Sequence, residues 1–296
     1  MAVSKRAAMK FKSVQNQAEL VKSYLLSDPY LSYTSVLSGI FASKMAMIYY
    51  ICYRVVGSFN PKSFPSQVYD FSHLISTSYF RTYAGLTKIQ RIEWNNRGMS
   101  TAHAIFISTM SLYFVFWSDL YSDHLIAGNI TFRSSQLSSF ALGLSVGYFI
   151  SDLAMICWLY PALGGMEYVI HHSLSGIAVA YSLLTGEGQL YTFMVLISEV
   201  TTPEINMRWF LDTAGLKRSN AYLINGVVIF FAWLVARILL FVYMFYHVHL
   251  HYDQVMQMHI VGRNLIFVVP AALGIMNLMW FGKIVKGLRS TLAKKL

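Results

Sequence analysis

Long apolar stretches separated by short polar links dominate the sequence. Seven of these stretches are candidates for membrane-spanning helices, although the fifth is short and interrupted. They cover residues 34–56, 99–117, 137–160, 166–184, 189–203, 221–246 and 263–282. About 20 apolar residues form a helix that crosses the hydrocarbon core of a bilayer. Only 12% of the 296 residues are charged, about half of the ~25% that is usual in soluble domains. The sequence therefore predicts an all-α, polytopic membrane helix bundle and excludes a soluble fold.

The chain divides into four regions. Residues 1–33 form a basic N-terminal segment, and residues 34–89 hold the first transmembrane helix and an interfacial amphipathic helix. The amphipathic helix is predicted over Phe64 to Leu86, where apolar residues recur at helical spacing among polar ones. Residues 90–285 form the main domain, and residues 286–296 form a basic C-terminal tail.

The basic residues orient the predicted spans. Five basic residues without an acid follow the last span, at Lys283, Lys286, Arg289, Lys294 and Lys295. The positive-inside rule places this end in the cytosol. Counting backwards then puts residues 118–136 in the lumen, with Asn129 as a glycosylation candidate in the sequon Asn-Ile-Thr. Seven spans would leave the basic N-terminus in the lumen, so either that end breaks the rule or one stretch does not cross.

Several polar residues fall inside the predicted spans, all in the cytosolic half. They are His103, Asp152, His171, His172, Glu199 and Asn277. Ionisable residues at membrane depth are costly, and each marks a candidate functional site. Short links make the third, fourth and fifth spans antiparallel neighbours, so Asp152, a histidine and Glu199 could meet. A buried histidine beside a carboxylate suits acid–base or nucleophilic catalysis, but such pairs also tie helices together by hydrogen bonds. Residue types alone do not choose between these interpretations.

Two further polar features lie in the fifth and sixth spans. Pro203 lacks a backbone donor and would free carbonyl groups near Glu199, Thr201 and Thr202 to line a cavity, unless it only kinks or ends the span. Arg237 lies in the sixth span without an acidic neighbour in its own helix, so it is expected to snorkel or to cap a carbonyl.

A series of motifs runs through the main domain. The motifs are Glu93-Trp94-Asn95-Asn96-Arg97 with Ser100 and His103, Gly147 to Asp152, His171-His172, Ser198 to Pro203, Asn206, Arg208-Trp209, and Asn277 with Trp280-Phe281. In order and spacing they resemble the TLC-domain family, which includes ceramide synthases and translocating-chain-associated membrane proteins. The resemblance is closest to the branch of TLC-domain-containing transmembrane proteins and covers roughly residues 90–285.

The resemblance implies a bundle of six core helices around a lipid-accessible cavity, preceded by one extra N-terminal helix. It also implies residence in the endoplasmic reticulum and a lumenal N-terminus. The candidate catalytic residues are His171, His172, Asp152 and Glu199. The candidate lipid-binding residues are Trp94, Arg97, His103, Thr201, Thr202, Asn206, Arg208 and Asn277.

The sequence departs from that of ceramide synthases on the helix after the paired histidines. In the synthases a His-Asp-x-x-Asp box lies on that helix, whereas this sequence has Ser198-Glu199 there. This difference favours a protein that binds or senses a membrane lipid in lipid homeostasis. The alternative is an acyl-CoA-dependent lipid N-acyltransferase that uses His171 and His172. Membrane lipids, and acyl-CoA in the second case, are the expected partners; nucleic acid, a cofactor and a metal are not expected.

Overall fold

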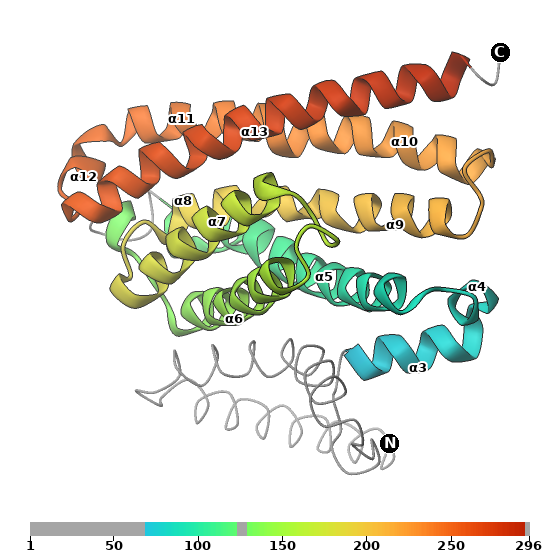
Figure 1. The fold of residues 1–296 in the computed structure, drawn as a ribbon. Coiled ribbons are helices and arrows are strands. Elements are labelled where there is room, and N and C mark those ends of the chain that lie inside the picture. The colour runs from blue at the N-terminus through green and yellow to red at the C-terminus, as the bar shows by residue number, and fades with distance from the viewer. Residues whose placement is uncertain (1–68, 123–128, 294–296) are drawn as a thin grey trace, which may run out of the picture.

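The computed structural model describes residues 69–122 and 129–293, which form helices joined by short loops. Six helical segments run side by side in this part of the chain (Figure 1). They are α5 (Lys88–Leu112) with η2 (Tyr113–Trp117), α6 (Gln136–Trp158), α7 (Met166–Thr185), α8 (Gln189–Leu196) with η5 (Ile197–Thr201) and α9 (Thr202–Thr213), α10 (Asn220–Trp233) with η6 (Leu234–Leu239) and α11 (Leu240–Leu250), and α13 (Ile260–Ala293). The predicted all-α helix bundle is confirmed. The predicted span at 34–56 and the basic segment 1–33 lie outside the described residues.

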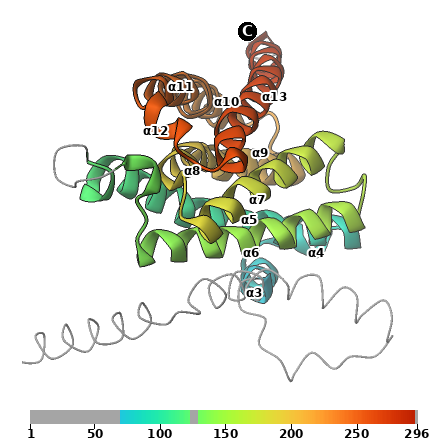
Figure 2. The ribbon, with the colours of Figure 1, turned by 90° about the vertical axis from the view of Figure 1, so that its left-hand side faces the viewer.

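The segments form three layers. Helices α5 and α6 lie on one side, α10, α11 and α13 on the other, and α7, α8 and α9 between them (Figures 1 and 2). The segments long and apolar enough to cross a membrane are Lys88–Trp117, Gln136–Trp158, Asn220–Leu250 and Ile260–Ala293, all in the two outer layers.

Helix α5 begins well before the predicted span at 99–117. Thr87 caps its N-terminus, because its side chain accepts a hydrogen bond from the Gln90 backbone and the Gln90 side chain bonds back. The additional turns are rich in polar residues and have low hydropathy, which is why the apolar pattern missed them. They carry Glu93, Asn96 and Arg97 into the bundle.

The fifth segment also continues beyond its predicted end at residue 203. The chain forms a 3₁₀ turn, η5, and then continues as α9, with Pro203 in its first turn. A proline is tolerated there because the first backbone donors of a helix lack partners in any case. The predicted disturbance around Glu199 is therefore present, but Pro203 does not end the segment.

Part of the predicted amphipathic region forms α3 (Tyr69–Tyr79) and α4 (Arg81–Ala84). Helix α3 lies outside the bundle, next to α5 (Figures 1 and 2). Trp94 Nε1 on α5 donates to Ser76 Oγ on α3 at 2.9 Å. Gly98 permits this approach, because a Cβ atom there would lie 2.6 Å from Ser72 Oγ.

The apolar core fills the half of the bundle away from the end of α13. Buried side chains from all six segments meet there, including Ile107, Phe114, Leu142, Phe193 and Met244. The short elements η3 (Asp119–Tyr121), η4 (Ile130–Phe132) and α12 (Tyr252–Met256) close this end. The other end, where α13 finishes, holds a large cavity lined by polar side chains.

Candidate functional site

A cavity of about 600 Å³, here called the polar chamber, opens between the helices near the end of α13. This volume lies within the range of small-molecule sites, ~300–1,000 Å³. Every one of the six segments contributes to its walls. Eight predicted site residues line it: Arg97, Asp152, His171, His172, Glu199, Thr202, Asn206 and Arg208. The sequence therefore predicted much of the wall, although these residues come from distant parts of the chain.

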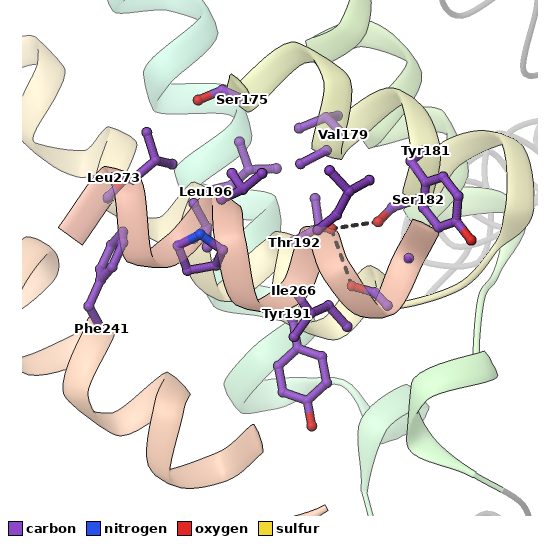
Figure 3. A pocket seen from close by; sticks show the side chains of 18 of the residues that line it. Ser175, Val179, Tyr181, Ser182, Tyr191, Thr192, Leu196, Phe241, Ile266 and Leu273 are labelled. Carbon is purple, nitrogen blue, oxygen red and sulfur yellow. Dashed lines mark hydrogen bonds between the residues drawn. The ribbon is translucent and has the colours of Figure 1, made fainter. Parts of the chain in front are cut away.

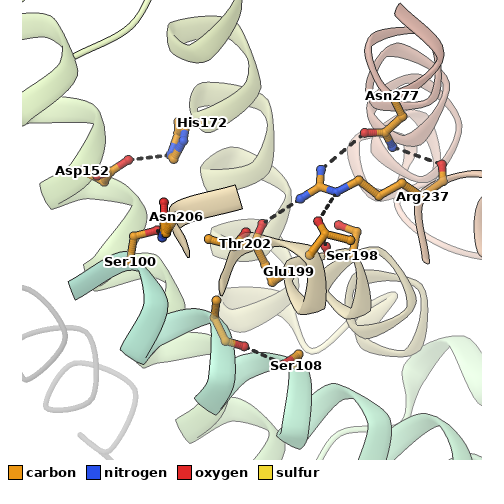
Figure 4. A network of polar contacts seen from close by, with 12 residues as sticks. Ser100, Ser108, Asp152, His172, Ser198, Glu199, Thr202, Asn206, Arg237 and Asn277 are labelled. Atoms are coloured by element: carbon orange, nitrogen blue, oxygen red, sulfur yellow. Dashed lines mark hydrogen bonds and ion pairs between the residues drawn. The ribbon is translucent and has the colours of Figure 1, made fainter. Parts of the chain in front are cut away.

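Asp152 joins three helices at one side of the chamber. Its Oδ2 atom on α6 lies 3.1 Å from His172 Nδ1 on α7 (Figure 4). Its Oδ1 atom accepts a hydrogen bond of 2.9 Å from Asn96 Nδ2 on α5. The carboxylate thereby lies within ion-pair distance of the His172 ring. The predicted meeting of Asp152 with a histidine is present, and the histidine is His172.

Glu199 does not join this pair but contacts Arg237. Arg237 Nη2 lies 3.8 Å from Glu199 Oε1, and both side chains are buried. Arg237 also donates to Thr201 Oγ1 at 2.8 Å and to Asn277 Oδ1 at 3.3 Å (Figure 4). The π-helical η6 segment carries Arg237 into this position. The expectation that Arg237 snorkels or caps a carbonyl is wrong, because its acidic partner comes from another helix.

Asn206 and Arg97 link α9 to α5 at the chamber wall. Asn206 Nδ2 donates to Thr101 Oγ1 at 2.9 Å and to the Arg97 carbonyl at 3.1 Å. Arg97 in turn donates to Asn206 Oδ1 and forms an ion pair of 2.8 Å with Glu93. These contacts make this part of the wall rigid before any ligand binds.

His171 occupies a different environment from His172. The Nδ1 atoms of both rings are buried and make no hydrogen bond within the described residues, but only His172 Nδ1 has a carboxylate oxygen nearby, at 3.1 Å. The His171 ring packs against His172 and against Trp280 of α13, with ring centroids 5.4 and 5.5 Å apart. As expected for consecutive helical residues, the two rings point in different directions. Of the two histidines, only His171 also reaches a second cavity.

The second cavity, here called the apolar channel, is lined by side chains that include Ser175 to Ser182 on α7 and Tyr191 to Leu196 on α8 (Figure 3), and its lining also includes His171. It is narrow, with a volume of about 50 Å³. Its walls come from α6, α7, α8, α11 and α13 and are mostly hydrocarbon, including Phe149, Val179, Leu196, Phe241, Ile266 and Leu273. His171, Glu199 and Arg237 line both cavities and therefore form their junction.

Comparison with known proteins identifies the domain. The family model described as the TLC domain matches residues 93–286. The chain belongs to the TLC-domain family. This confirms the resemblance on which the motif analysis rested, and supports an integral membrane protein.

Relatives from distant organisms match most of the chain. A TLC domain-containing protein 4-B from Xenopus laevis is 29% identical over 237 residues, covering 74% of this chain and 85% of the relative. The TLC domain-containing protein 4 of Homo sapiens is 29% identical over 226 residues, covering 74% and 82%. A TLC domain-containing protein 4 A from Dictyostelium discoideum is 25% identical over 223 residues, covering 75% and 84%. These names support the TLC-domain-containing branch. No solved structure matches the chain.

Four predicted lipid-binding residues of the TLC domain lie outside the polar chamber. Trp94 is buried among aromatic rings at the contact with α3, and Thr201 is buried as a partner of Arg237. His103 stacks on Tyr148 at 3.8 Å and contacts Ser145 Oγ at 3.1 Å. Asn277 lines the apolar channel. The first three residues therefore support the walls from behind, whereas a ligand in the channel would reach Asn277.

Asn129, the glycosylation candidate, lies at the opposite end of the TLC domain from the polar chamber. Its Nδ2 atom donates to Gln257 Oε1 at 2.7 Å, and Thr131 of the same sequon is fully buried. Within residues 69–122 and 129–293, no group of three His, Cys, Asp or Glu side chains is placed to hold a metal ion.

Proposed function

We propose that this TLC-domain protein binds a membrane lipid and acts in membrane lipid homeostasis. The headgroup would occupy the polar chamber and a hydrocarbon chain would enter the apolar channel. The observation that carries the proposal is the junction, because His171, Glu199 and Arg237 line both cavities. A polar site that continues into an apolar one matches a molecule with a polar head and an apolar tail.

The physical character of the channel favours a hydrocarbon chain over water. Apolar cavities in proteins stay dry, since a water molecule there would lack hydrogen-bond partners. A chain that moves from the bilayer into the channel gains little free energy, because both environments are apolar. The contacts in the polar chamber would therefore decide which lipid binds.

The proposal includes an orientation. The basic residues that follow position 282, on the C-terminal part of α13 and beyond it, favour a cytosolic C-terminus, which would place the polar chamber near the cytosolic leaflet. Family precedent favours the endoplasmic reticulum. The headgroup would then be exchanged from the cytosolic side, and the channel would extend toward the lumenal leaflet.

A second candidate function, acyl transfer from acyl-CoA, is favoured by one specific observation. His171 Nδ1 is buried at the junction without a hydrogen-bond partner in the described part of the chain, while the neighbouring His172 has Asp152 Oδ2 at 3.1 Å from its Nδ1 atom. The His171 nitrogen could attack the thioester carbon and expel the CoA thiolate, which would leave an acyl-imidazolium. An amine lipid would then take the acyl group and lose its proton to His172. Glu199 would not orient a histidine, since it contacts Arg237 and Thr202.

The binding proposal is tested by filling the channel. Ala178 lines the channel, and Ala178→Trp would insert a large ring into it. The matched control is Ala271→Trp, because Ala271 is an exposed helical alanine on α13. We expect mass spectrometry of the purified protein to find a lipid retained by the wild type and by the control but lost from Ala178→Trp. Retention of that lipid by Ala178→Trp, with unchanged thermal stability, would contradict the proposal.

The same preparation separates binding from acyl transfer. Purified protein is incubated with acyl-CoA and mixed amine lipids, and the products and the His171 peptide are analysed by mass spectrometry. An acylated peptide or product that disappears in His171→Ala supports the enzyme. If neither forms while lipid is retained, the acyltransferase hypothesis fails and lipid binding remains.

A further inference from the structure

The charged groups around the polar chamber do not balance. Its described lining holds four Lys or Arg residues, namely Arg97, Arg208, Arg237 and Lys283, against three acids, Glu93, Asp152 and Glu199. The acids are all engaged: Glu93 with Arg97, Glu199 with Arg237, and Asp152 with Asn96 and His172. Arg208 and Lys283 are left without a carboxylate partner among the described residues.

Arg208 is held in place by contacts that leave most of its donors available. Its guanidinium lies 3.8 Å from the centroid of the Tyr222 ring, and Nη1 donates to the Tyr222 carbonyl at 3.1 Å. Gly226 makes room for it, since a Cβ atom there would lie 2.8 Å from Nη1. Of the acids one turn away on α9, Asp212 bonds to Lys217, and Glu204 forms no ion pair with Arg208, while its Oε2 atom is buried without a hydrogen-bond partner among the described residues. The arginine is thus a fixed positive charge on the chamber wall.

Lys283 supplies the second charge from α13. Its side chain lines the chamber and is exposed, which places it at the opening. A Cβ atom added at Gly226 would lie 2.8 Å from Arg208 Nη1 and 3.7 Å from Leu288 of α13, so α13 passes close to Arg208. Arg208 on α9 and Lys283 on α13 therefore bring two cations without carboxylate partners to the lining of the same chamber.

We propose that Arg208 and Lys283 form a binding site for a phosphate group on the ligand in the polar chamber. The inference rests on the proposed function, because it assigns the polar end of the bound molecule. Arginine offers a planar set of donors that fits phosphate oxygens, and lysine adds a mobile point charge. A carboxylate-free pair of cations beside a chamber of this size selects an anionic group over a neutral one.

The phosphate could belong to a phospholipid headgroup or to acyl-CoA. Both carry a hydrocarbon chain for the channel, so the chemistry at Arg208 and Lys283 is shared. Probes separate the sources: dioleoylphosphatidic acid is the phospholipid, palmitoyl-CoA is the thioester, and dioleoylglycerol has chains without phosphate. Each probe is titrated into the purified full-length protein in detergent, in competition with a fluorescent lipid.

Three variants complete the experiment. Lys283→Gln removes an exposed charge without disturbing packing, and Arg208→Gln removes the fixed one. Lys286→Gln is the matched control, because Lys286 is an exposed lysine on the same helix that does not line the chamber. A basic residue near an anionic group contributes ~1 kcal/mol, which corresponds to about 5-fold in affinity. We expect a loss of about 5-fold for Lys283→Gln and at least that for Arg208→Gln, confined to phosphate-bearing probes.

The outcomes distinguish this inference from the proposed function. Tighter binding of either phosphate probe than of dioleoylglycerol, lost in Lys283→Gln but kept in Lys286→Gln, supports the site, and the preferred probe names the source. Equal binding of all three probes overturns the phosphate site while the lipid-binding function stands. If no chain-bearing probe binds to the wild type, the proposed function fails as well. Should Arg208→Gln fold poorly, Lys283→Gln alone decides.

Discussion

Replacing Arg237 by glutamine tests whether the junction between the two cavities is held by a buried ion pair. Arg237 and Glu199 are about nine-tenths or more buried, and the variant leaves the carboxylate without its cation. It also removes the donors to Thr201 and Asn277. We expect Arg237→Gln to be strongly destabilised, because a buried charge without a partner is far costlier than the pair is stabilising.

The magnitude comes from the geometry. At the observed separation of 3.8 Å, an effective dielectric constant of ~20 gives an attraction of about 4 kcal/mol. Removal of one member of a buried pair typically costs ~3–5 kcal/mol, which agrees with this value. A domain of this size loses roughly 2–4 °C in melting temperature per kcal/mol. The expected fall in melting temperature is therefore at least about 6 °C.

The assay is thermal unfolding of the purified protein in one detergent, followed by intrinsic fluorescence. The double variant Glu199→Gln/Arg237→Gln removes both charges together, so it should be more stable than Arg237→Gln alone. Lys217→Gln is a control, since the ion pair that it breaks with Asp212 is exposed. A melting temperature of Arg237→Gln within 2 °C of the wild type would refute the reasoning. So would a double variant less stable than the single one.

Three other perturbations test the described contacts and the orientation. Asp152→Asn replaces the carboxylate that lies 3.1 Å from His172 Nδ1 and should lower the free energy of unfolding by ~1–3 kcal/mol. Denaturant unfolding measures this change, and a variant as stable as the wild type would contradict the prediction. Gly98→Ala places a Cβ atom 2.6 Å from Ser72 Oγ and should loosen the contact of α3 with α5, which limited proteolysis would detect as faster cleavage of α3. Adding Ser72→Gly to this variant should restore resistance to the protease. Cleavage at the wild-type rate in both variants would count against close packing at this contact. An epitope tag at the C-terminus should be accessible when only the plasma membrane is permeabilised, whereas protection of the tag would reverse the proposed orientation.

Much of the candidate site could be predicted from the sequence because charge is scarce in it. In a chain with 12% charged residues, Asp152, Glu199, His171 and His172 stand out within apolar stretches. The cost of burying such groups means that they gather inside the bundle, and the structure places these four at one chamber. The boundaries were less predictable. The first turns of α5 have low hydropathy because they line the chamber, so an apolar window missed them.

The pairing of the polar groups could not be predicted in the same way. Sequence spacing suggested that Asp152, a histidine and Glu199 meet, yet Asp152 contacts His172 while Glu199 contacts Arg237. The partner of Arg237 was missed because its own helix carries no acid nearby, although a lone arginine in an apolar span requires an acceptor from another segment. Lys283 was predicted only as a basic residue of the tail, and the structure places it on the chamber wall.

The sequence alone determined that this protein is a membrane helix bundle of the TLC-domain family, because apolar length and motif order are properties of the chain itself. The tertiary structure decided which polar groups meet, that His171 rather than His172 lies at the junction, and that two cavities share that junction. These depend on the rotation of each helix about its axis and on which neighbour it faces. A difference of one residue turns a side chain by ~100°, so packing selects the contacts.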